Sequence, residues 1–140
     1  MPIAAVLVDS GPLYACVDAD DRHHAEPLGL LRSHPGPLLV PALVVTEVAC
    51  LLGSRLGAEA EVRFLGDLAG GDFAVEGVAA GDWLRIAELV WHYRGLPLGT
   101  VDASVIAAAE RLGIGQVVTL DRRHFAAVRP GHCAPLDLLP

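Results

Sequence analysis

Residues 3–12 read Ile3-Ala-Ala-Val-Leu-Val-Asp-Ser-Gly-Pro12, an unbroken apolar run closed by an aspartate and a turn. A short apolar run of this kind is typical of a strand that is buried on both faces of a parallel sheet. Asp9 then stands at the carboxyl end of the strand. Ser10 is a good N-cap residue and Pro12 suits a first helical turn, so a short helix should follow through Leu13 to Val17.

The rest of the chain alternates the same two kinds of element. Apolar runs predict further strands, the last of them at a sheet edge, over Leu38–Val40, Phe73–Val75, Val117–Leu120 and Leu136–Leu139. Helical spacing predicts helices over Asp18–Arg32, with Pro27 as a kink or restart, and over Ala42–Arg55, Ala58–Ala69, Ala80–Tyr93, Asp102–Leu112 and Arg122–Ala126. This alternation indicates an α/β sandwich, in which helices flank a central, mainly parallel sheet. With 140 residues and no linker or repeat, residues 1–140 are expected to form a single domain.

The composition is more apolar than a lone domain requires. Apolar residues make up 53% of the chain, against about 45–50% in typical soluble domains. A second copy or a tightly held partner would cover the excess, and the predicted helix over residues 80–93 offers a side with Trp83, Ile86, Ala87, Val90 and Trp91. No apolar run reaches the roughly 18 residues of a membrane span, so the protein is expected in the cytoplasm. Three cysteines without metal-site spacing are expected as buried free thiols: Cys16, Cys50 and Cys133.

The charged residues exclude some classes of protein. A formal net charge of −7 argues against a protein that holds nucleic acid by bulk electrostatics. All ten basic residues are arginines, and the absence of lysine excludes P-loop NTPases and disfavours response-regulator receivers. Arginine is well suited to binding phosphate groups. A nuclease with this charge is therefore reasonable only if several of its acids bind divalent metal.

Two carboxylates directly follow predicted strands. Asp9 follows the first strand, and Asp121 follows the strand over Val117–Leu120. Ligands of open parallel sheets gather beyond the carboxyl ends of the strands. If these two strands are neighbours, the two side chains come close although more than a hundred residues separate them. Taken singly, each aspartate fits the N-cap of the next helix equally well.

Glu47 lies in a predicted helix that is apolar on almost every side. Its neighbours at helical spacing are Leu43, Cys50 and Leu51. A buried charge is costly unless it is paired or bound to a metal. The alternative is a side chain that reaches solvent or pairs with an arginine.

Asp102 stands at the start of the clearest helix. It shares a face with Val105, Ile106, Ala109 and Leu112, while Ser104 and Arg111 lie opposite. The acid therefore points in the direction of the core. Since the residue three positions later is Val105, a capping box is excluded, and a plain N-cap is the alternative.

Together these four acids, each delivered by an apolar element to one end of a sheet, would repel one another unless a cation binds them. Mg²⁺ or Mn²⁺ prefers oxygen ligands and is readily completed by a substrate phosphate. Thr119, on the same side of its strand as Asp121, would orient a ligand or simply serve as a β-branched strand residue. The sequence thus predicts a metal-dependent nuclease site.

Four stretches in this order resemble PIN domains, and more narrowly the VapC toxins of bacterial toxin-antitoxin systems. They are Val8-Asp-Ser-Gly-Pro-Leu13, Thr46-Glu-Val48, Val101-Asp-Ala-Ser-Val-Ile-Ala-Ala108 and Thr119-Leu-Asp-Arg-Arg-His-Phe125. Each is weak alone, but together they span nearly the whole chain. The resemblance implies a PIN-like fold, Mg²⁺ with Mn²⁺ as an alternative, endoribonuclease activity, a homodimer and inhibition by a VapB-type antitoxin. The family's acidic positions match the four acids considered above, so the resemblance gives the catalytic and metal-binding roles to Asp9, Glu47, Asp102 and Asp121.

Some residues near these motifs carry weaker predictions. Gly95 stands where related sequences often have a further acid, which puts a fifth acidic contribution in doubt. Arg122 and Arg123 would hold flanking phosphates or form a solvated pair. His124 would serve near the site or pack beside Phe125, and the packing interpretation is preferred. A zinc site is not expected at the adjacent surface histidines, His23 and His24.

Three alternatives remain open from the sequence. A PIN-like module without turnover would act through RNA or partner contacts, but it has little reason to bury four acids. A phosphatase of the haloacid-dehalogenase type usually has DxD after its first strand and a later lysine, which Asp9-Ser-Gly11 and the absence of lysine do not match. DNA is also a possible substrate, because PIN relatives include flap-type nucleases.

Overall fold

Short apolar segments form the sheet at the centre of the protein. The computed structural model describes residues 4–132 and 135–140, and their strands are β1 (Val6–Val8), β2 (Leu38–Pro41), β3 (Ala74–Glu76), β4 (Gln116–Val118) and β5 (Asp137–Leu139). All pairings are parallel, in the order β3-β2-β1-β4-β5. The three residues of β1 are fully buried, as a strand covered on both faces requires. The predicted parallel sheet, with β5 at its edge, is confirmed.

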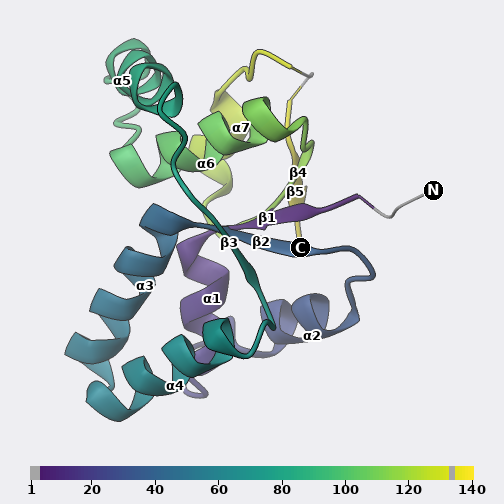
Figure 1. Ribbon diagram of the computed structural model, residues 1–140, viewed down its shortest axis with the longest axis vertical. Helices are drawn as coiled ribbons and strands as arrows, with labels where there is room; N and C mark the ends of the chain where they lie inside the picture. The colour runs from purple at the N-terminus through teal and green to yellow at the C-terminus, as the bar shows by residue number, and fades with distance from the viewer. Residues whose placement is uncertain (1–3, 133–134) are drawn as a thin grey trace.

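Helices cover both faces of this sheet (Figure 1). One layer contains α1 (Ser10–Val17), α2 (Ala25–Ser33), α3 (Ala42–Arg55) and α4 (Ala58–Ala69). The other contains α5 (Asp82–His92), α6 (Thr100–Leu112) and α7 (Arg122–Ala127). The result is the three-layer α/β sandwich that the sequence predicts. In the described part of the chain, no helix is long and apolar enough to cross a membrane.

The ends of the middle helices follow from glycines. The helices α3 and α4 have the predicted bounds, and between them Gly57 adopts a positive φ of 96° that L side chains rarely take. Gly113 closes α6 in the left-handed region, at φ 68°. These stops are local, which explains why the sequence predicts them well.

The segment before α2 departs from the predicted helix over residues 18–32. The Oδ1 atom of Asp18 accepts a hydrogen bond from the Asp20 amide, and that of Asp21 accepts one from the His23 amide. Such local bonds offer the backbone an alternative to a helix. The helix α2 therefore starts at Ala25, and Pro27 falls in its first turn, where a missing N–H leaves no helical bond unmade.

The predicted face of α6 is wrong, whereas the tryptophans of the side predicted in α5 are open to a partner. In α5 the buried residues are Asp82, Ile86 and Leu89, whereas Trp83 is 52% and Trp91 69% exposed. The carboxylate of Asp82 accepts hydrogen bonds from Arg111 of α6, so the buried side of α5 faces that helix. In α6 every residue from 103 to 109 is buried, including Ser104, because β2, α3 and α5 all pack against it.

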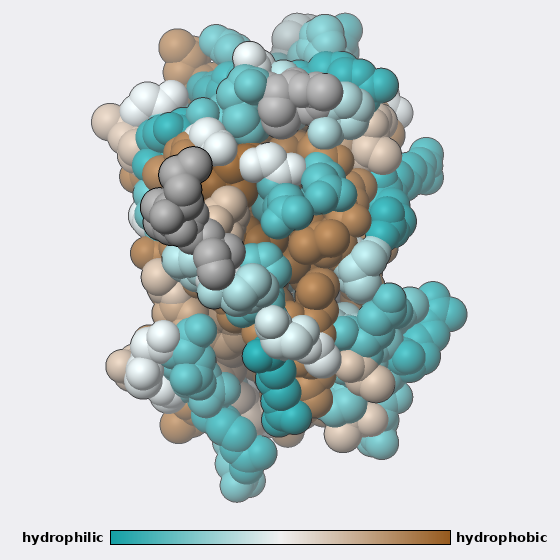
Figure 2. Space-filling model, turned by 90° about the vertical axis from the view of Figure 1, so that its right-hand side faces the viewer, coloured by the Kyte–Doolittle hydropathy of each residue, from teal (hydrophilic) through white to brown (hydrophobic). Residues whose placement is uncertain are grey.

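The prediction of buried thiols is only partly correct. Cys16 is partly buried, but Cys50 is exposed on α3, and Cys133 lies outside the described residues. Exposure of Cys50 shows that α3 has an open side, which the apolar spacing of its sequence conceals. Figure 2 looks onto the amino ends of the strands, opposite the end where Asp9 lies, and shows apolar side chains gathered between polar ones.

Candidate active site

Asp9 lies where β1 ends and α1 begins. Its backbone amide donates to the carbonyl of Val118 at 2.9 Å, which fixes the residue between β1 and β4. These neighbouring strands run into opposite helical layers, so Asp9 lies at the topological switch point of the sheet. Asp9 occupies the N-cap position of α1, but its side chain caps no amide there. Its N-cap alternative is therefore wrong, and so is the prediction of Ser10 as the cap.

The carboxyl group of Asp9 is buried, with only 4% of the residue exposed. Its Oδ2 atom accepts a hydrogen bond of 2.9 Å from the Thr119 hydroxyl. Its Oδ1 atom is buried and has no hydrogen-bond partner among the described residues. Burial raises the pKa of Asp9 to about 6, hydrogen bonds from Ser10 and Thr119 oppose the rise, and the charges of Asp102 and Glu47 add to it.

Glu47 reaches the same place from α3. Its Oε1 atom accepts a hydrogen bond from the hydroxyl of Ser10, which belongs to the first turn of α1. The side chain is partly buried, and it pairs with no arginine in the described residues. Of the two alternatives for Glu47, the arginine pair is thus wrong, while the residue keeps a partly open side.

Asp102 is the third residue of α6, since this helix begins at Thr100 and Gly99 occupies the N-cap position. The plain N-cap alternative for Asp102 is therefore wrong. Burial raises its pKa, the hydrogen bond from His124 opposes the rise, and the charges of Asp121 and Glu47 add to it. Because Asp102 also raises the pKa of Asp9, the charges of Glu47, Asp102 and Asp121 each act on another acid of this group.

Asp121 follows β4 and caps α7, because its side chain accepts a hydrogen bond from the His124 amide at 3.3 Å. The helix-cap interpretation of this residue is thus correct, and it does not exclude a second role. The hydroxyl of Thr119 accepts a bond of 2.9 Å from the Asp121 amide while it donates to Asp9. Thr119, only 1% exposed, therefore links the two aspartates that end neighbouring strands.

His124 belongs to this group, contrary to its interpretation as a packing residue. Its Nδ1 atom lies 3.0 Å from Oδ2 of Asp102 and 3.0 Å from Oδ2 of Asp121. The residue that packs is its neighbour Phe125, which is fully buried. The signal that would have found His124 is its spacing, since residues three apart share a helix face and Asp121 starts this helix.

The four acids line one cavity of about 620 Å³ at the carboxyl end of the sheet. Its lining comes from α1, α3, α6 and the segment after β4, namely Asp9, Ser10, Gly11, Glu47, Gly99, Thr100, Val101, Asp102, Leu120 and Asp121. Arg122 and Arg123 are exposed and do not belong to this lining. Arg122 donates instead to the carbonyls of Leu138 and Pro140, so its expected phosphate contact is not supported.

The sequence model of the PIN domain family matches residues 6–129, which include all four acids. The chain belongs to the PIN domain family. A ribonuclease of Mycobacterium tuberculosis named VapC26 is 34% identical over 125 residues, 89% of this chain and 93% of the relative. This membership excludes the dehalogenase-type alternative.

Several solved structures have the same architecture. VapC20 of Mycobacterium tuberculosis, described as a toxin that cleaves the sarcin-ricin loop, superposes with a TM-score of 0.75 at 25% identity, over 80% of this chain and 86% of that one. The FitAcB protein of Neisseria gonorrhoeae gives a TM-score of 0.71 at 15% identity, over 96% of both chains. VapBC2 of Rickettsia felis, bound to promoter DNA, gives 0.70 at 14% identity, over 96% of both chains. The latter two likenesses concern the fold alone.

The acid-lined cavity of this PIN domain suits a hard divalent cation. PIN nucleases generally depend on divalent metal ions, and the cluster of acids is present in this chain. Carboxylate oxygens are the ligands such ions prefer, and the free Oδ1 atom of Asp9 is a buried acceptor that a cation would satisfy. The carboxylates of this cavity therefore fit the divalent metal ion on which PIN nucleases generally depend.

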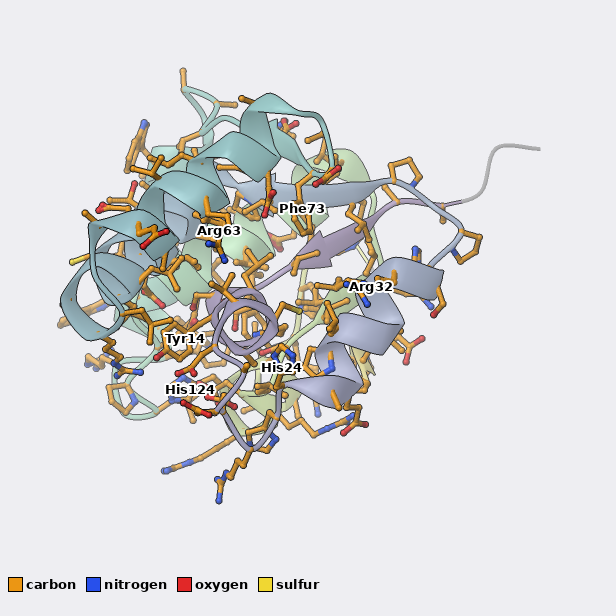
Figure 3. The ribbon with its side chains drawn as sticks, turned by 90° about the horizontal axis from the view of Figure 1, so that it is seen from below. Tyr14, His24, Arg32, Arg63, Phe73 and His124 are labelled. Carbon is orange, nitrogen blue, oxygen red and sulfur yellow. The ribbon has the colours of Figure 1, made fainter. Side chains whose placement is uncertain are left out.

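A second cavity of about 560 Å³ lies between α1, α2, α4 and the start of β3. Apolar side chains form most of its lining, with Arg32 from α2 and Arg63 from α4 at its sides. In Figure 3, Arg63 and Phe73 are labelled in the upper part of the view and Arg32 to the right, whereas His124 lies at the lower left. The acid cluster and this apolar cavity are thus separate features of the PIN domain.

Proposed function

We propose that this protein is a metal-dependent endoribonuclease, the toxin of a toxin-antitoxin pair, and that Asp9, Glu47, Asp102 and Asp121 bind its metal and form its catalytic site. The observation that carries the proposal is the buried, unpartnered Oδ1 atom of Asp9 in a cavity lined by the three other acids. We also propose that residues 1–140 form one PIN domain, because the described elements share one sheet.

The acids would hold Mg²⁺, with Mn²⁺ as the alternative ion. The bound ion lowers the pKa of a water molecule, polarises the phosphoryl oxygen and offsets charge in the transition state. Asp9 is the member held most rigidly, because Thr119 and the Val118 carbonyl fix it from two directions. Glu47 is oriented by the Ser10 hydroxyl, and one of the partly exposed acids would take the proton of the attacking water.

The names of the relatives support RNA as the substrate. The relative with 34% identity is named a ribonuclease, and the VapC20 structure is described as that of a toxin that cleaves an RNA loop. The structural neighbours include toxin-antitoxin complexes, which supports a VapB-type antitoxin as the partner of this chain. A protein that cleaves cellular RNA would act in the cytoplasm, where we place it.

The net charge of −7 gives the metal a second task. Without a cation, four carboxylates in one cavity repel a phosphodiester as well as one another. A divalent ion would offset this repulsion at the reacting phosphate. RNA binding should therefore require the metal, and not only RNA cleavage.

The experiment is a cleavage assay on end-labelled RNA and DNA of the same sequence, with Mg²⁺, with Mn²⁺ and with EDTA. We expect the wild-type protein to cut RNA internally when either metal is present and to be inactive in EDTA. Asp9→Asn should lose at least about 100-fold in rate, because it removes a charged ligand from the buried end of the site.

Asp137→Asn is the matched control, since this acid lies on β5 and accepts a hydrogen bond from Gln116 outside the cavity. It should cut like the wild type. Equal cutting by Asp9→Asn and the wild type, or cutting in EDTA, would contradict the proposal. Metal-dependent cutting of DNA but not RNA would keep the site and overturn the substrate, and metal-dependent RNA binding without cutting would indicate a binding module.

A further inference from the structure

The imidazole of His124 lies within contact distance of two acids of the site. Its Nδ1 atom lies 3.0 Å from one oxygen each of Asp102 and Asp121. Within the described part of the chain, these three residues form a group whose ligand atoms all lie within 4.8 Å of one another. The three residues come from two elements, the first turn of α6 and the first turn of α7 with its N-cap.

These spacings match the corners of a metal coordination sphere. Two ligand atoms on neighbouring corners of an octahedron, each about 2.1 Å from the ion, lie about 3.0 Å apart, and opposite corners lie about 4.2 Å apart. The distances from the His124 Nδ1 atom to the two carboxylate oxygens, 3.0 Å each, equal the first value. Because all ligand atoms of the group lie within 4.8 Å of one another, the two carboxylate oxygens can occupy neighbouring or opposite corners. A single ring nitrogen also cannot donate fully to both acids, which leaves the pair incompletely satisfied.

The fold holds the ring in this place. Asp121 caps α7 through the His124 amide, and Phe125 and Val128, both fully buried, anchor the helix in the core. The side chain of His124 is only 21% exposed. Its position is therefore set before any ion binds, which is the condition for a selective site. The unpartnered Oδ1 atom of Asp9, in the cavity that Asp102 and Asp121 also line, is a further buried acceptor that a cation here would satisfy.

We propose that His124 is a metal ligand, and that Asp102, Asp121 and the Nδ1 atom of His124 together form a mixed nitrogen and oxygen site that favours Mn²⁺ over Mg²⁺. The inference rests on the proposed function and adds a ligand to its four acids. Mg²⁺ requires oxygen ligands and water, whereas first-row transition ions also accept imidazole nitrogen. Mn²⁺ binds most weakly in that series, so it is the most stringent ion with which to test the preference.

The experiment measures metal binding directly, without RNA. Pulsed electron paramagnetic resonance of the wild-type protein loaded with one equivalent of Mn²⁺ should show the coupling of a directly bound imidazole ¹⁴N nucleus. The coupling should vanish in His124→Phe, which keeps a ring of similar volume but no nitrogen. Calorimetric titration should show Mn²⁺ binding weakened at least about tenfold in His124→Phe, and Mg²⁺ binding weakened less than about threefold.

His92→Ala is the matched control, because His92 is exposed on α5 and packs only its ring edge against Tyr93. It should keep both the coupling and the affinity. Mn²⁺ that binds to the wild type without an imidazole coupling, or a coupling that persists in His124→Phe, overturns the inference and leaves the proposed function intact. A wild-type protein that binds neither ion overturns both. The wild-type spectrum decides the matter even if His124→Phe fails to fold.

Discussion

At the scale of single residues, burial and charge oppose each other at Asp9. The strand end places its carboxyl group among apolar side chains, where ionisation is costly. Thr119 and the Ser10 amide favour the ionised form, and yet the pKa remains raised to about 6. In the metal-free protein, Asp9 therefore destabilises the fold when it ionises.

The first prediction concerns the pH dependence of metal-free stability. The pKa of Asp9 is about 6 in the folded protein and near its model value of 3.8 when unfolded, so the folded protein binds its proton more tightly. The stabilisation from protonated Asp9 is fully present below pH 4 and is lost as the pH rises through 6. This loss lowers the free energy of unfolding by about 3 kcal/mol. Denaturant unfolding in EDTA should show this loss for the wild type and not for Asp9→Asn.

Addition of Mn²⁺ at pH 7 is the complementary measurement for that prediction. An ion that binds only the folded protein stabilises it by mass action. It should recover the wild-type stability and stabilise Asp9→Asn less, because this variant keeps Asp102, Asp121 and His124 but lacks one carboxylate ligand. Parallel pH curves for the two metal-free proteins would show that Asp9 is not the group responsible.

The second prediction concerns Thr119, whose hydroxyl bonds to both Asp9 and the Asp121 amide. Thr119→Val should lower the free energy of unfolding by about 1–3 kcal/mol, because the buried Asp9 carboxyl group loses its donor and the Asp121 amide loses its acceptor. It should also reduce kcat at saturating metal, since both aspartates lose their shared restraint. Thr119→Ser keeps the hydroxyl and should restore most of the rate, and a Ser variant as slow as the Val variant would count against a positioning role.

The residues of the site were predictable where an acidic side chain stands among apolar residues. Asp9, Glu47 and Asp102 are conspicuous as acids beside apolar elements, and the structure places them in one cavity with Asp121. Contact partners depend on exact geometry, so the bond from Ser10 to Glu47 and the place of His124 had no clear trace in the composition. Their spacing from Asp9 and Asp121 was the sole available hint.

At the scale of elements, α6 is the most constrained part of the protein. Its residues 103–109 are all buried, and three of them are alanines with at most 2% exposure. Small side chains let the sheet and two other helices approach this helix on all sides. This tight packing sets the direction of its first turn, and with it the position of Asp102.

The third prediction tests that packing. Ala109→Leu adds volume where the residue has no exposure, so it should lower the free energy of unfolding by about 1–3 kcal/mol. Ala87→Leu makes the same change at an exposed position of α5 and should alter stability by less than about 0.5 kcal/mol. Denaturant unfolding of both proteins gives the comparison, and equal effects would mean that α6 can shift to make room.

Element boundaries were predictable where local signals act alone. The bounds of α3 and α4 follow from proline, glycine and spacing, and they are confirmed. The start of α2 was not predictable from helical spacing, because side-chain bonds of Asp18 and Asp21 hold the preceding turn. The buried face of α5 depends on a distant partner, Arg111, which no local pattern reveals.

At the scale of the whole molecule, the sequence predicted a parallel sheet but not its order. That β1 pairs with β4 depends on contacts between residues more than a hundred positions apart. This pairing brings Asp9 and Asp121 together, while Glu47 and Asp102 reach the same cavity from α3 and α6. From the sequence, the two aspartates come close only if their strands are neighbours, and the strand order of the structure meets this condition.

The fourth prediction concerns self-association. The face of α5 that points outward carries Trp83, Leu84 and Trp91, each more than half exposed, with Arg94 stacked over the Trp91 ring. Exposed apolar groups of this size usually mark an interface. Light scattering of the protein alone at micromolar concentration should give twice the mass of one chain. Leu84→Glu should shift it to a monomer, whereas Val62→Glu, at an exposed position of α4, should not; a monomeric wild type would refute the prediction.

The four acids occupy positions 9, 47, 102 and 121, so nearly the whole length of the chain contributes to one cavity. On the proposed function, a ribosome that stalls at any codon before the last of these releases a fragment with an incomplete set of ligands. Unfinished copies of the toxin are then harmless to the transcripts of the cell that makes them.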